Sequence, residues 1–296
     1  MRTTKSQISS YHIQLRLFLL PYLLGTAFLV VLPALATVGV AFTEYNTVAP
    51  PRWVGLDNFR QLLASPLVRL SLWNTFLFAA LAVPLRLLVA FALALLLQWR
   101  GRLSGFYRAS VYLPTVIPEA AYGLIWLWIF NPVYGPLNLL LQLLGLPAPA
   151  WLVEPETARL AIVIMLVFQM GEGFLVLLAG LQNIPRSYYE AAVVDGASGW
   201  QSFRHITLPL IAPWLLLLTF RDLLASVQNT FAPSFILTYG GPYYATTFLP
   251  LLVYELAFDF FDFGLAAALL VLTYVVMAVL IVGIIRLVGV SGSNDF

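Results

Sequence analysis

The 296-residue chain has no cysteine and very little charge. The absence of cysteine excludes disulfides, thiolate chemistry and cysteine metal sites. Two histidines, His12 and His205, are too few for a histidine-rich metal centre, so we predict no metal site. Charged residues make up 9% of the chain, against roughly 25% in a soluble domain, and hydrophobic residues make up 61%. Together with a mean hydropathy of +0.91, this composition predicts an integral membrane protein without a separate soluble domain.

Six apolar runs are each long enough to cross a bilayer, which takes about 20 residues of helix. They lie at about 17–42, 71–98, 107–130, 159–182, 210–236 and 264–288. We therefore predict an all-α, polytopic membrane protein in which residues 1–296 form one transmembrane domain. The first run contains Ala34-Leu35-Ala36, which has the pattern of a signal-peptide cleavage site. It is nevertheless longer than the ~7–15 apolar residues of a signal peptide, which favours a span.

The basic residues orient these spans. One set of flanking segments carries Arg2, Lys5, Arg16, Arg100, Arg102, Arg108, Arg186, Arg204 and Arg286. The other set carries only Arg52, Arg60, Arg69 and Arg159. Because Lys and Arg accumulate in cytoplasmic loops, we expect both termini and the loop 183–209 in the cytoplasm. Segments 43–70, 131–158 and 237–263 are then expected on the outer side.

The loop 183–209 contains "EAAVVDGASGWQSFRHITLPL", a mostly polar stretch between two apolar runs. Its first part predicts a helix that ends at Val194, followed by a bend at Gly196, because glycine accepts positive φ at little cost. Ser198 is a suitable N-cap for a second short helix, Gly199 to about Ile206. These features alone leave two interpretations open, an amphipathic anchor on the membrane surface and a docking element for a soluble partner.

The spacing of this stretch carries a family resemblance. Glu190-Ala191-Ala192 is followed after three residues by Gly196, and then by Ile206 and Leu208-Pro209. This pattern resembles the cytoplasmic EAA signature of permease subunits in ATP-binding-cassette (ABC) importers. Four further stretches resemble the sugar-type, maltose-permease-like branch: "NTFLFAALAVPLRLLVAFALALLL", "YRASVYLPTVIPEAAYGLIWLWIFNPVYGPLN", "LAGLQNIPRSYYEAA" and "LTYGGPYYATTFLPLLVYELAFDFFDFGLAAAL".

The resemblance implies the transmembrane-domain fold of type I ABC importers, in a bacterial or archaeal cytoplasmic membrane. It also implies a heterodimer with a second, homologous permease, two copies of an ABC ATPase that hold ATP and Mg, and an extracytoplasmic sugar-binding protein. Nucleic acid is not an expected partner. In the family the EAA element contacts the ATPase, which here assigns Glu190, Ala191, Ala192, Asp195, Gly196 and Ala197. The chain has no G-x-x-x-x-G-K-[ST] phosphate-binding loop, so ATP hydrolysis is expected on the partner and no enzymatic activity on this chain.

Charged residues near the middle of the predicted spans form a second group of candidates. They are Arg86, Glu119, Glu172, Arg221 and Asp222. A charge at this depth costs about 2.5–3.5 kcal/mol on insertion scales, so we expect these side chains to face the bundle interior or a wet cavity. Two interpretations stay open, mutual pairing, in which two arginines neutralise two of three carboxylates, and contact with substrate. For Glu172, which Gly171 and Gly173 flank, contact with substrate is favoured.

The resemblance also implies a sugar site about midway down the spans before and after the EAA loop. The corresponding residues are Phe168, Gln169, Glu172, Leu223, Val227, Gln228, Asn229 and Thr230. Some relatives carry asparagines where this chain has Val227 and Thr230, and Gln228 and Asn229 are the neighbouring residues able to compensate.

The predicted function is that of a permease subunit that translocates a sugar, either a disaccharide or an oligosaccharide, with the EAA loop coupling the ATPase to alternating access. Glycerol phosphate or a monosaccharide is an alternative substrate within the same family. An ion-coupled secondary transporter is a different class, and such folds often show internal repeats, which this sequence lacks. An intramembrane enzyme is a third class, and no nucleophile–base pair or metal motif supports it. The sequence does not indicate which sugar is carried.

Overall fold

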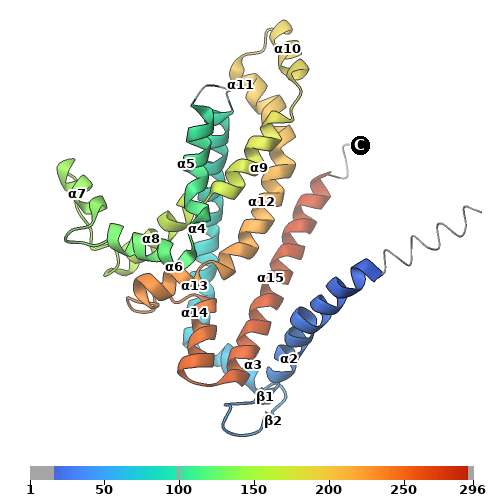
Figure 1. Ribbon diagram of the computed structural model, residues 1–296, viewed down its shortest axis with the longest axis vertical. Helices are drawn as coiled ribbons and strands as arrows, with labels where there is room; N and C mark the ends of the chain where they lie inside the picture. The colour runs from blue at the N-terminus through green and yellow to red at the C-terminus, as the bar shows by residue number, and fades with distance from the viewer. Residues whose placement is uncertain (1–16, 99–100, 102, 293–296) are drawn as a thin grey trace, which may run out of the picture. The chain divides into compact units, whose positions relative to one another are not determined.

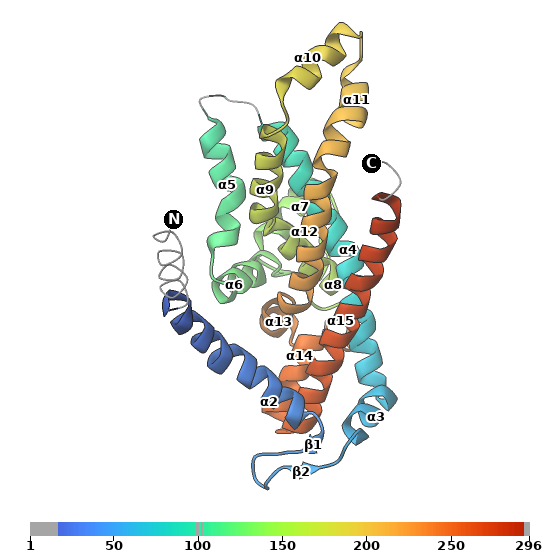
Figure 2. The same cartoon turned by 90° about the vertical axis from the view of Figure 1, so that its right-hand side faces the viewer.

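A computed structural model describes residues 17–98, 101 and 103–292, with side chains described as far as Arg286. The chain is mainly helical (Figures 1 and 2). It divides into two compact units. The first comprises Met1–Ala64 and Val253–Val276, and the second comprises Ser65–Leu252 and Met277–Phe296.

The first unit contains a helical stretch over Leu17–Val40 and a small hairpin. Its elements, with η marking π-helical turns, are η1 (Ala27–Val31), α2 (Leu32–Val40), β1 (Thr43–Glu44), β2 (Arg52–Trp53), α3 (Asp57–Ala64), η4 (Glu255–Asp259) and the first part of α15 (Phe263–Gly292). The two strands pair antiparallel, with Thr43 opposite Trp53. The buried Asn58 side chain donates hydrogen bonds to the carbonyls of Ala41 and Thr43, both at 2.9 Å, which fastens α3 to the hairpin.

The second unit contains most of the helical bundle. Its elements are α4 (Pro66–Leu97), α5 (Ser104–Val116), α6 (Glu119–Ile129), α7 (Pro136–Leu143), α8 (Pro155–Phe168), α9 (Gly171–Gln182), α10 (Arg186–Val194), α11 (Gly199–Ser202), η2 (Phe203–Thr207), α12 (Leu208–Gln228), α13 (Phe231–Pro233), η3 (Ser234–Thr238) and most of α14 (Leu249–Tyr254). Helix α4 lies beside α9 and α12 in both views (Figures 1 and 2).

Helices long and apolar enough to cross a membrane agree with four of the six predicted spans. They are Leu17–Val40, Pro66–Leu97, Gly199–Thr238 and Phe263–Arg286. A fifth span forms if α8 and α9 are taken together, because the pair is bent by 45° where the helix breaks at Gln169 and Met170. The described part of the chain therefore holds four continuous spans and one bent span.

The predicted span at 107–130 is made of two helices and not of one continuous helix. Helix α5 ends at Val116 and α6 begins at Glu119. Pro118 lacks an amide hydrogen and clashes with a helical conformation of the preceding residue. Ile117 accordingly adopts an extended conformation with ψ of 129°. As a consequence Glu119 lies in the first turn of α6 and is exposed on this chain.

Small residues bring the central helices close together. Between membrane helices the association depends on packing, because lipid tails are as apolar as the side chains. On α4, Ala90 and Ala94 are fully buried on one face, in the same core cluster as Phe174 and Leu177 of α9 and Ile211 of α12. The close packing of α4 against α9 and α12 therefore depends on the small residues Ala90 and Ala94, which lie four positions apart on one face of α4.

A side chain from α6 supports the bend between α8 and α9. At the bend the Gln169 amide bonds to Leu166, so it does not bond to Met165 as a regular helix would require. The Tyr122 hydroxyl donates to the Met165 carbonyl at 2.8 Å and so satisfies it. Irregular backbone at membrane depth is stable only with such partners, so Tyr122 is part of the bend.

The tight packing of α9 against α5 generates a prediction for Gly171. A methyl group there would clash with Thr115 Oγ1 and lie 2.9 Å from the Tyr112 Cα, whereas one at Gly173 would lie 4.0 Å from its nearest neighbour, Leu218 Cδ1. We expect Gly171→Ala to lower the thermal midpoint of the purified protein, with an overpacking cost of about 1–3 kcal/mol. Gly173→Ala is the matched control and should change it little. Equal midpoints for the two variants would contradict this packing.

Candidate coupling element and intramembrane charge network

The residues predicted to form a bend after Val194 do so. Helix α10 closes with a Schellman motif, in which the Gly196 amide donates to the Val193 carbonyl at 3.1 Å and the Ala197 amide donates to the Ala192 carbonyl at 2.8 Å. Gly196 has φ of +77°, a value that side chains rarely permit. The predicted turn is confirmed, and glycine is required there by the backbone conformation.

The start of the next helix is also as predicted. Ser198 and Gln201 form a capping box, because the Gln201 amide donates to Ser198 Oγ at 3.3 Å and the Ser198 amide donates to Gln201 Oε1 at 2.7 Å. The predicted end near Ile206 is wrong, since the helical path runs on from Gly199 to Thr238. The π-helical turn η2 ends at Thr207, two residues before Pro209, which lies in the first turn of α12 and has no amide hydrogen to donate.

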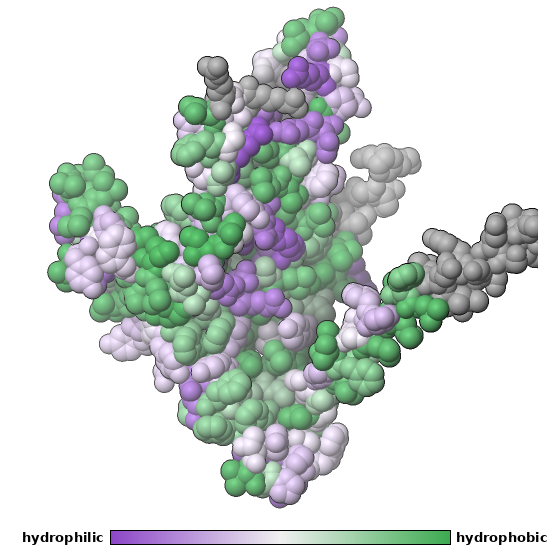
Figure 3. Space-filling model, viewed as in Figure 1, coloured by the Kyte–Doolittle hydropathy of each residue, from purple (hydrophilic) through white to green (hydrophobic). Residues whose placement is uncertain are grey.

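The segment from α10 to η2, residues 186–207, is termed the knob below. It lies at one end of the second unit in both views, and hydrophilic side chains gather over it in Figure 3. The Tyr189 hydroxyl lies 2.9 Å from the Thr207 hydroxyl, which joins α10 to η2. Phe203 stacks on Trp200 at 5.4 Å and on Phe91 of α4 at 6.2 Å between ring centroids. The knob is therefore fastened to both α4 and α12.

The surface of the knob carries the residues predicted to contact the ATPase. Glu190, Ala191, Asp195 and Gly196 are exposed, and Ala192 and Ala197 are half-buried. Large apolar side chains are exposed beside them. These are Tyr188, Val193 at 71%, Val194 at 87% and Trp200 at 68%. Exposed apolar side chains rimmed by polar ones are typical of an interaction surface.

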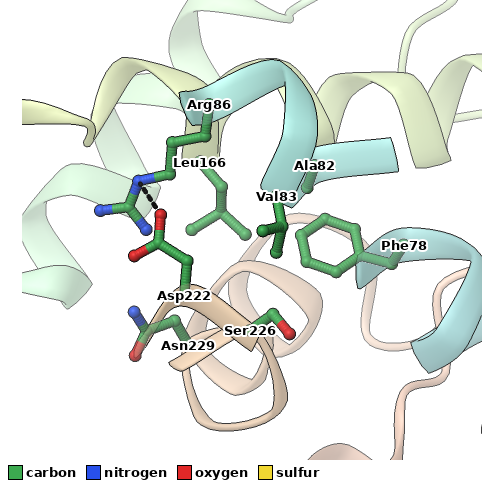
Figure 4. A pocket seen from close by; sticks show the side chains of 8 residues that line it. All are labelled: Phe78, Ala82, Val83, Arg86, Leu166, Asp222, Ser226 and Asn229. Carbon is green, nitrogen blue, oxygen red and sulfur yellow. Dashed lines mark ion pairs between the residues drawn. The ribbon is translucent and has the colours of Figure 1, made fainter. Parts of the chain in front are cut away.

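Four of the five predicted intramembrane charges form one network. Arg86 Nε lies 3.7 Å from Asp222 Oδ2 (Figure 4), Arg221 Nε lies 3.6 Å from Asp222 Oδ1, and Arg221 Nη2 lies 2.6 Å from Glu172 Oε2. The mutual pairing considered from the sequence is thus present. Glu119 makes no ion pair within the described part of the chain.

The network has a buried end and an open end. The Asp222 side chain is 2% exposed and the Arg86 side chain 12%. Arg86 Nη2 also donates to the Gln169 carbonyl at 2.5 Å, so it contacts the bend between α8 and α9. At the other end the Arg221 side chain is 33% exposed and that of Glu172 is 53% exposed. Within the network, the Arg221–Glu172 pair is therefore the exposed one in this chain.

A small cavity adjoins the buried end. It measures about 20 Å³, room for about one water molecule. Its lining, drawn in Figure 4, is Phe78, Ala82, Val83, Arg86, Leu166, Asp222, Ser226 and Asn229. Asp222 Oδ1 has no hydrogen-bond partner among the described residues, although Arg221 lies near it. The cavity offers polar groups from α4 and from the C-terminal part of α12.

The other predicted pathway residues divide into accessible and buried ones. Phe168 is exposed at the end of α8, against Trp126, and Gln169 lies at the bend. Gln228 is exposed, and Leu223 and Asn229 are half-buried. Val227 and Thr230 are buried in this chain. The structure therefore brings Gln169, Glu172 and the charge network together, and it turns Val227 and Thr230 towards the core.

Several residues that build these sites could not be identified from the sequence. Tyr122 supports the bend, Phe91 fastens the knob by stacking on Phe203, and Ser226 lines the cavity. Tyr122 and Ser226 carry no local pattern that distinguishes them. Phe203 itself could be expected from the sequence to pack onto the bundle or into a partner, as one of the apolar side chains of the loop 183–209.

Comparison with known proteins is consistent with this geometry. Residues 86–289 match the model of the family described as "Binding-protein-dependent transport system inner membrane component". The chain is 34% identical over 276 residues to the probable ABC transporter permease protein YesP of Bacillus subtilis, covering 92% of this chain and 87% of the relative. It is 34% identical over 263 residues to the trehalose/maltose transport system permease protein MalF of Thermococcus litoralis, covering 88% of each chain.

A solved structure has the same fold. It belongs to a bacterial ABC transporter involved in the import of the acidic polysaccharide alginate, and it superposes with a TM-score of 0.77 at 24% identity, covering 94% of this chain and 95% of that one. The family match spans more than half of the chain, and the relatives match almost along their whole length. The chain therefore belongs to the family of binding-protein-dependent transport system inner membrane components, the multi-pass permease subunits of ABC transporters.

Proposed function

We propose that this chain is one of two homologous permease subunits of an ABC importer that carries a disaccharide or oligosaccharide across a bacterial or archaeal cytoplasmic membrane. An extracytoplasmic binding protein delivers the sugar. The observation that carries the proposal is the match of the chain to a binding-protein-dependent permease family, with a relative named for trehalose and maltose transport. The structural neighbour named for alginate import supports a glycan as cargo.

The proposed topology has six spans within a single transmembrane domain and both termini in the cytoplasm. Helices α5 and α6 together make the third span, and α8 and α9 make the fourth. The uneven distribution of basic residues along the sequence supports this orientation. Arg108, Arg186 and Arg204 belong to the basic-rich set of flanking segments, and Arg52 and Arg60 belong to the sparser set. Arg2, Lys5, Arg16, Arg100 and Arg102 contribute to this count but lie outside the described residues.

The knob is proposed to dock on an ABC ATPase, two copies of which hold ATP and Mg and perform the hydrolysis. Glu190 and Asp195 offer charge, and Val193 and Val194 offer an apolar contact, all on the exposed surface. Because Gly199–Thr238 is one helical path, a displacement of the knob passes directly into the membrane helix that carries Arg221 and Asp222. Closing of the ATPases would then rock the spans between inward-facing and outward-facing states.

Expression of the chain with its expected partners tests the proposal. The complete transporter is reconstituted in proteoliposomes, and ATP-dependent uptake of sugar is measured with and without the binding protein. We expect the chain to co-purify with a second permease and the ATPase, and uptake to require ATP and the binding protein. A folded chain that never binds an ATPase would show that the assigned function is wrong.

Gly196 provides the sharpest test of the coupling role. A β-branched residue at φ of +77° is strained by about 1–3 kcal/mol, so Gly196→Val should deform the Schellman turn. We expect sugar uptake per ATP hydrolysed to fall about tenfold or more, since about 1.4 kcal/mol corresponds to a factor of ten. Gly199→Ala is the matched control, because no neighbour lies within 4 Å of its added methyl group and its φ is not positive. Normal coupling in Gly196→Val would exclude this role.

The Arg86–Asp222 pair is proposed to be structural, because it is buried and joins α4 to α12. Removing one partner of a buried pair typically costs about 3–5 kcal/mol, since the other charge stays buried and uncompensated. Arg86→Met should therefore lower the thermal midpoint strongly, and the double variant Arg86→Met/Asp222→Leu should recover much of the loss, because Arg221 and Glu172 still neutralise each other. Additive losses in this double-mutant cycle would show that the pair does not contribute as a unit.

A further inference from the structure

We propose, on the basis of the function above, that Glu172 is a specificity-determining residue that keeps Arg221 from binding anions, so that this permease carries uncharged sugars. Relatives and neighbours of this chain are named for both neutral and acidic cargo, so the family alone leaves the class open. The charge network of Arg86, Glu172, Arg221 and Asp222 provides a physical reason to prefer neutral over acidic sugars.

The buried arginine offers nothing to a substrate. Arg86 is held by the Asp222 carboxylate and by the Gln169 carbonyl, and its side chain is 12% exposed. Arg86 and Arg221 are the two basic residues in the interior of the described spans, so Arg221 is the remaining cation that an anionic sugar could reach.

Arg221 is reachable but already paired. Its guanidinium contacts Glu172 at 2.6 Å and Asp222 at 3.6 Å. The Glu172 side chain is 53% exposed and that of Arg221 is 33% exposed, so the carboxylate is the more accessible member of the pair. The four network charges sum to zero, since two arginines face two carboxylates. An approaching anion would meet the Glu172 carboxylate, and like charges repel each other.

The position of this pair fits a polar pathway. Arg221 lies near the middle of the Gly199–Thr238 helix, and Glu172 lies in the first turn of α9, immediately after the bend in the fourth span. An exposed ion pair at mid-span is too costly to face lipid tails, and it therefore faces a wet cavity or the partner subunit. The helix dipole favours a carboxylate in a first helical turn, which is where Glu172 lies.

The first measurement uses the wild-type transporter with its binding protein in proteoliposomes. The probes are a neutral oligosaccharide that the binding protein holds and the same oligosaccharide with its reducing end oxidised to a carboxylate. Affinity of the binding protein for each probe is measured by calorimetry, and uptake is compared at saturation. We expect uptake of the neutral probe to be about tenfold faster or more, since about 1.4 kcal/mol gives a factor of ten. A binding protein selective for acidic glycans, or equal uptake of both probes, overturns the proposal.

The second measurement compares variants by the ratio of carboxylated to neutral uptake. Glu172→Gln leaves Arg221 with only its longer contact to Asp222, and we expect the ratio to rise about tenfold. Glu119→Gln is the matched control, because it removes a mid-span carboxylate that pairs with neither arginine, and its ratio should not change. The double variant Glu172→Gln/Arg221→Gln should lose the gain, because the released cation is gone.

The outcomes separate the two proposals. If the wild-type complex takes up neither probe with ATP, the assigned function fails. If it takes up the neutral probe but Glu172→Gln and Glu119→Gln change the ratio equally, the role of Glu172 fails and the function stands. If the complex with Glu172→Gln does not assemble, the variant Arg221→Gln tests the proposal instead. Removal of the Arg221 cation is then expected to lower the ratio of carboxylated to neutral uptake below the wild-type value. An unchanged ratio in Arg221→Gln overturns the inference.

Discussion

The cost of placing charge in a low-dielectric membrane is the constraint on which the second unit depends. Arg86 meets this cost by contacting Asp222 of α12 and the Gln169 carbonyl at the end of α8. One side chain of α4 therefore fixes the place where three membrane segments meet. Breaking either contact leaves a buried polar group without its partner, which is more costly than never having had the pair.

The cost of an unpaired polar group in the membrane also explains how the irregular backbone between α8 and α9 is stabilised. A break in a membrane helix frees amide and carbonyl groups that lipid cannot satisfy, so other side chains must bind them. The Tyr122 hydroxyl satisfies Met165, and Arg86 satisfies Gln169. Both donors come from neighbouring helices, so the bend between α8 and α9 exists only within the packed unit. It places Glu172 at the start of α9, where its side chain stays accessible.

The helix Gly199–Thr238 joins the two candidate sites. Its first turns belong to the knob, and its middle carries Arg221 and Asp222. In the proposed function, docking at one end and selection of cargo at mid-membrane therefore share one rigid element. The aromatic stack of Phe203 on Phe91 adds α4 to this connection. A lever between an ATPase and a pathway requires such a contiguous path of packed side chains.

The sequence by itself determined the membrane class, four of the spans, and two features of the knob, the turn at Gly196 and the helix start at Ser198. Gly196 and Ser198 could be assigned because positive φ and helix capping depend on residues within one turn. The tertiary structure alone decided the rest. The sequence contains three mid-span carboxylates and two mid-span arginines, and it does not show which of them pair. The packing of α4, α9 and α12 places Asp222 and Glu172 beside the arginines, whereas Glu119 lies at the start of α6 and pairs with neither. The apolar run 107–130 did not reveal the break at Pro118, because hydropathy reports the composition of a segment and not the continuity of its helix. The burial of Val227 could not be predicted either, because it depends on which helix packs against α12.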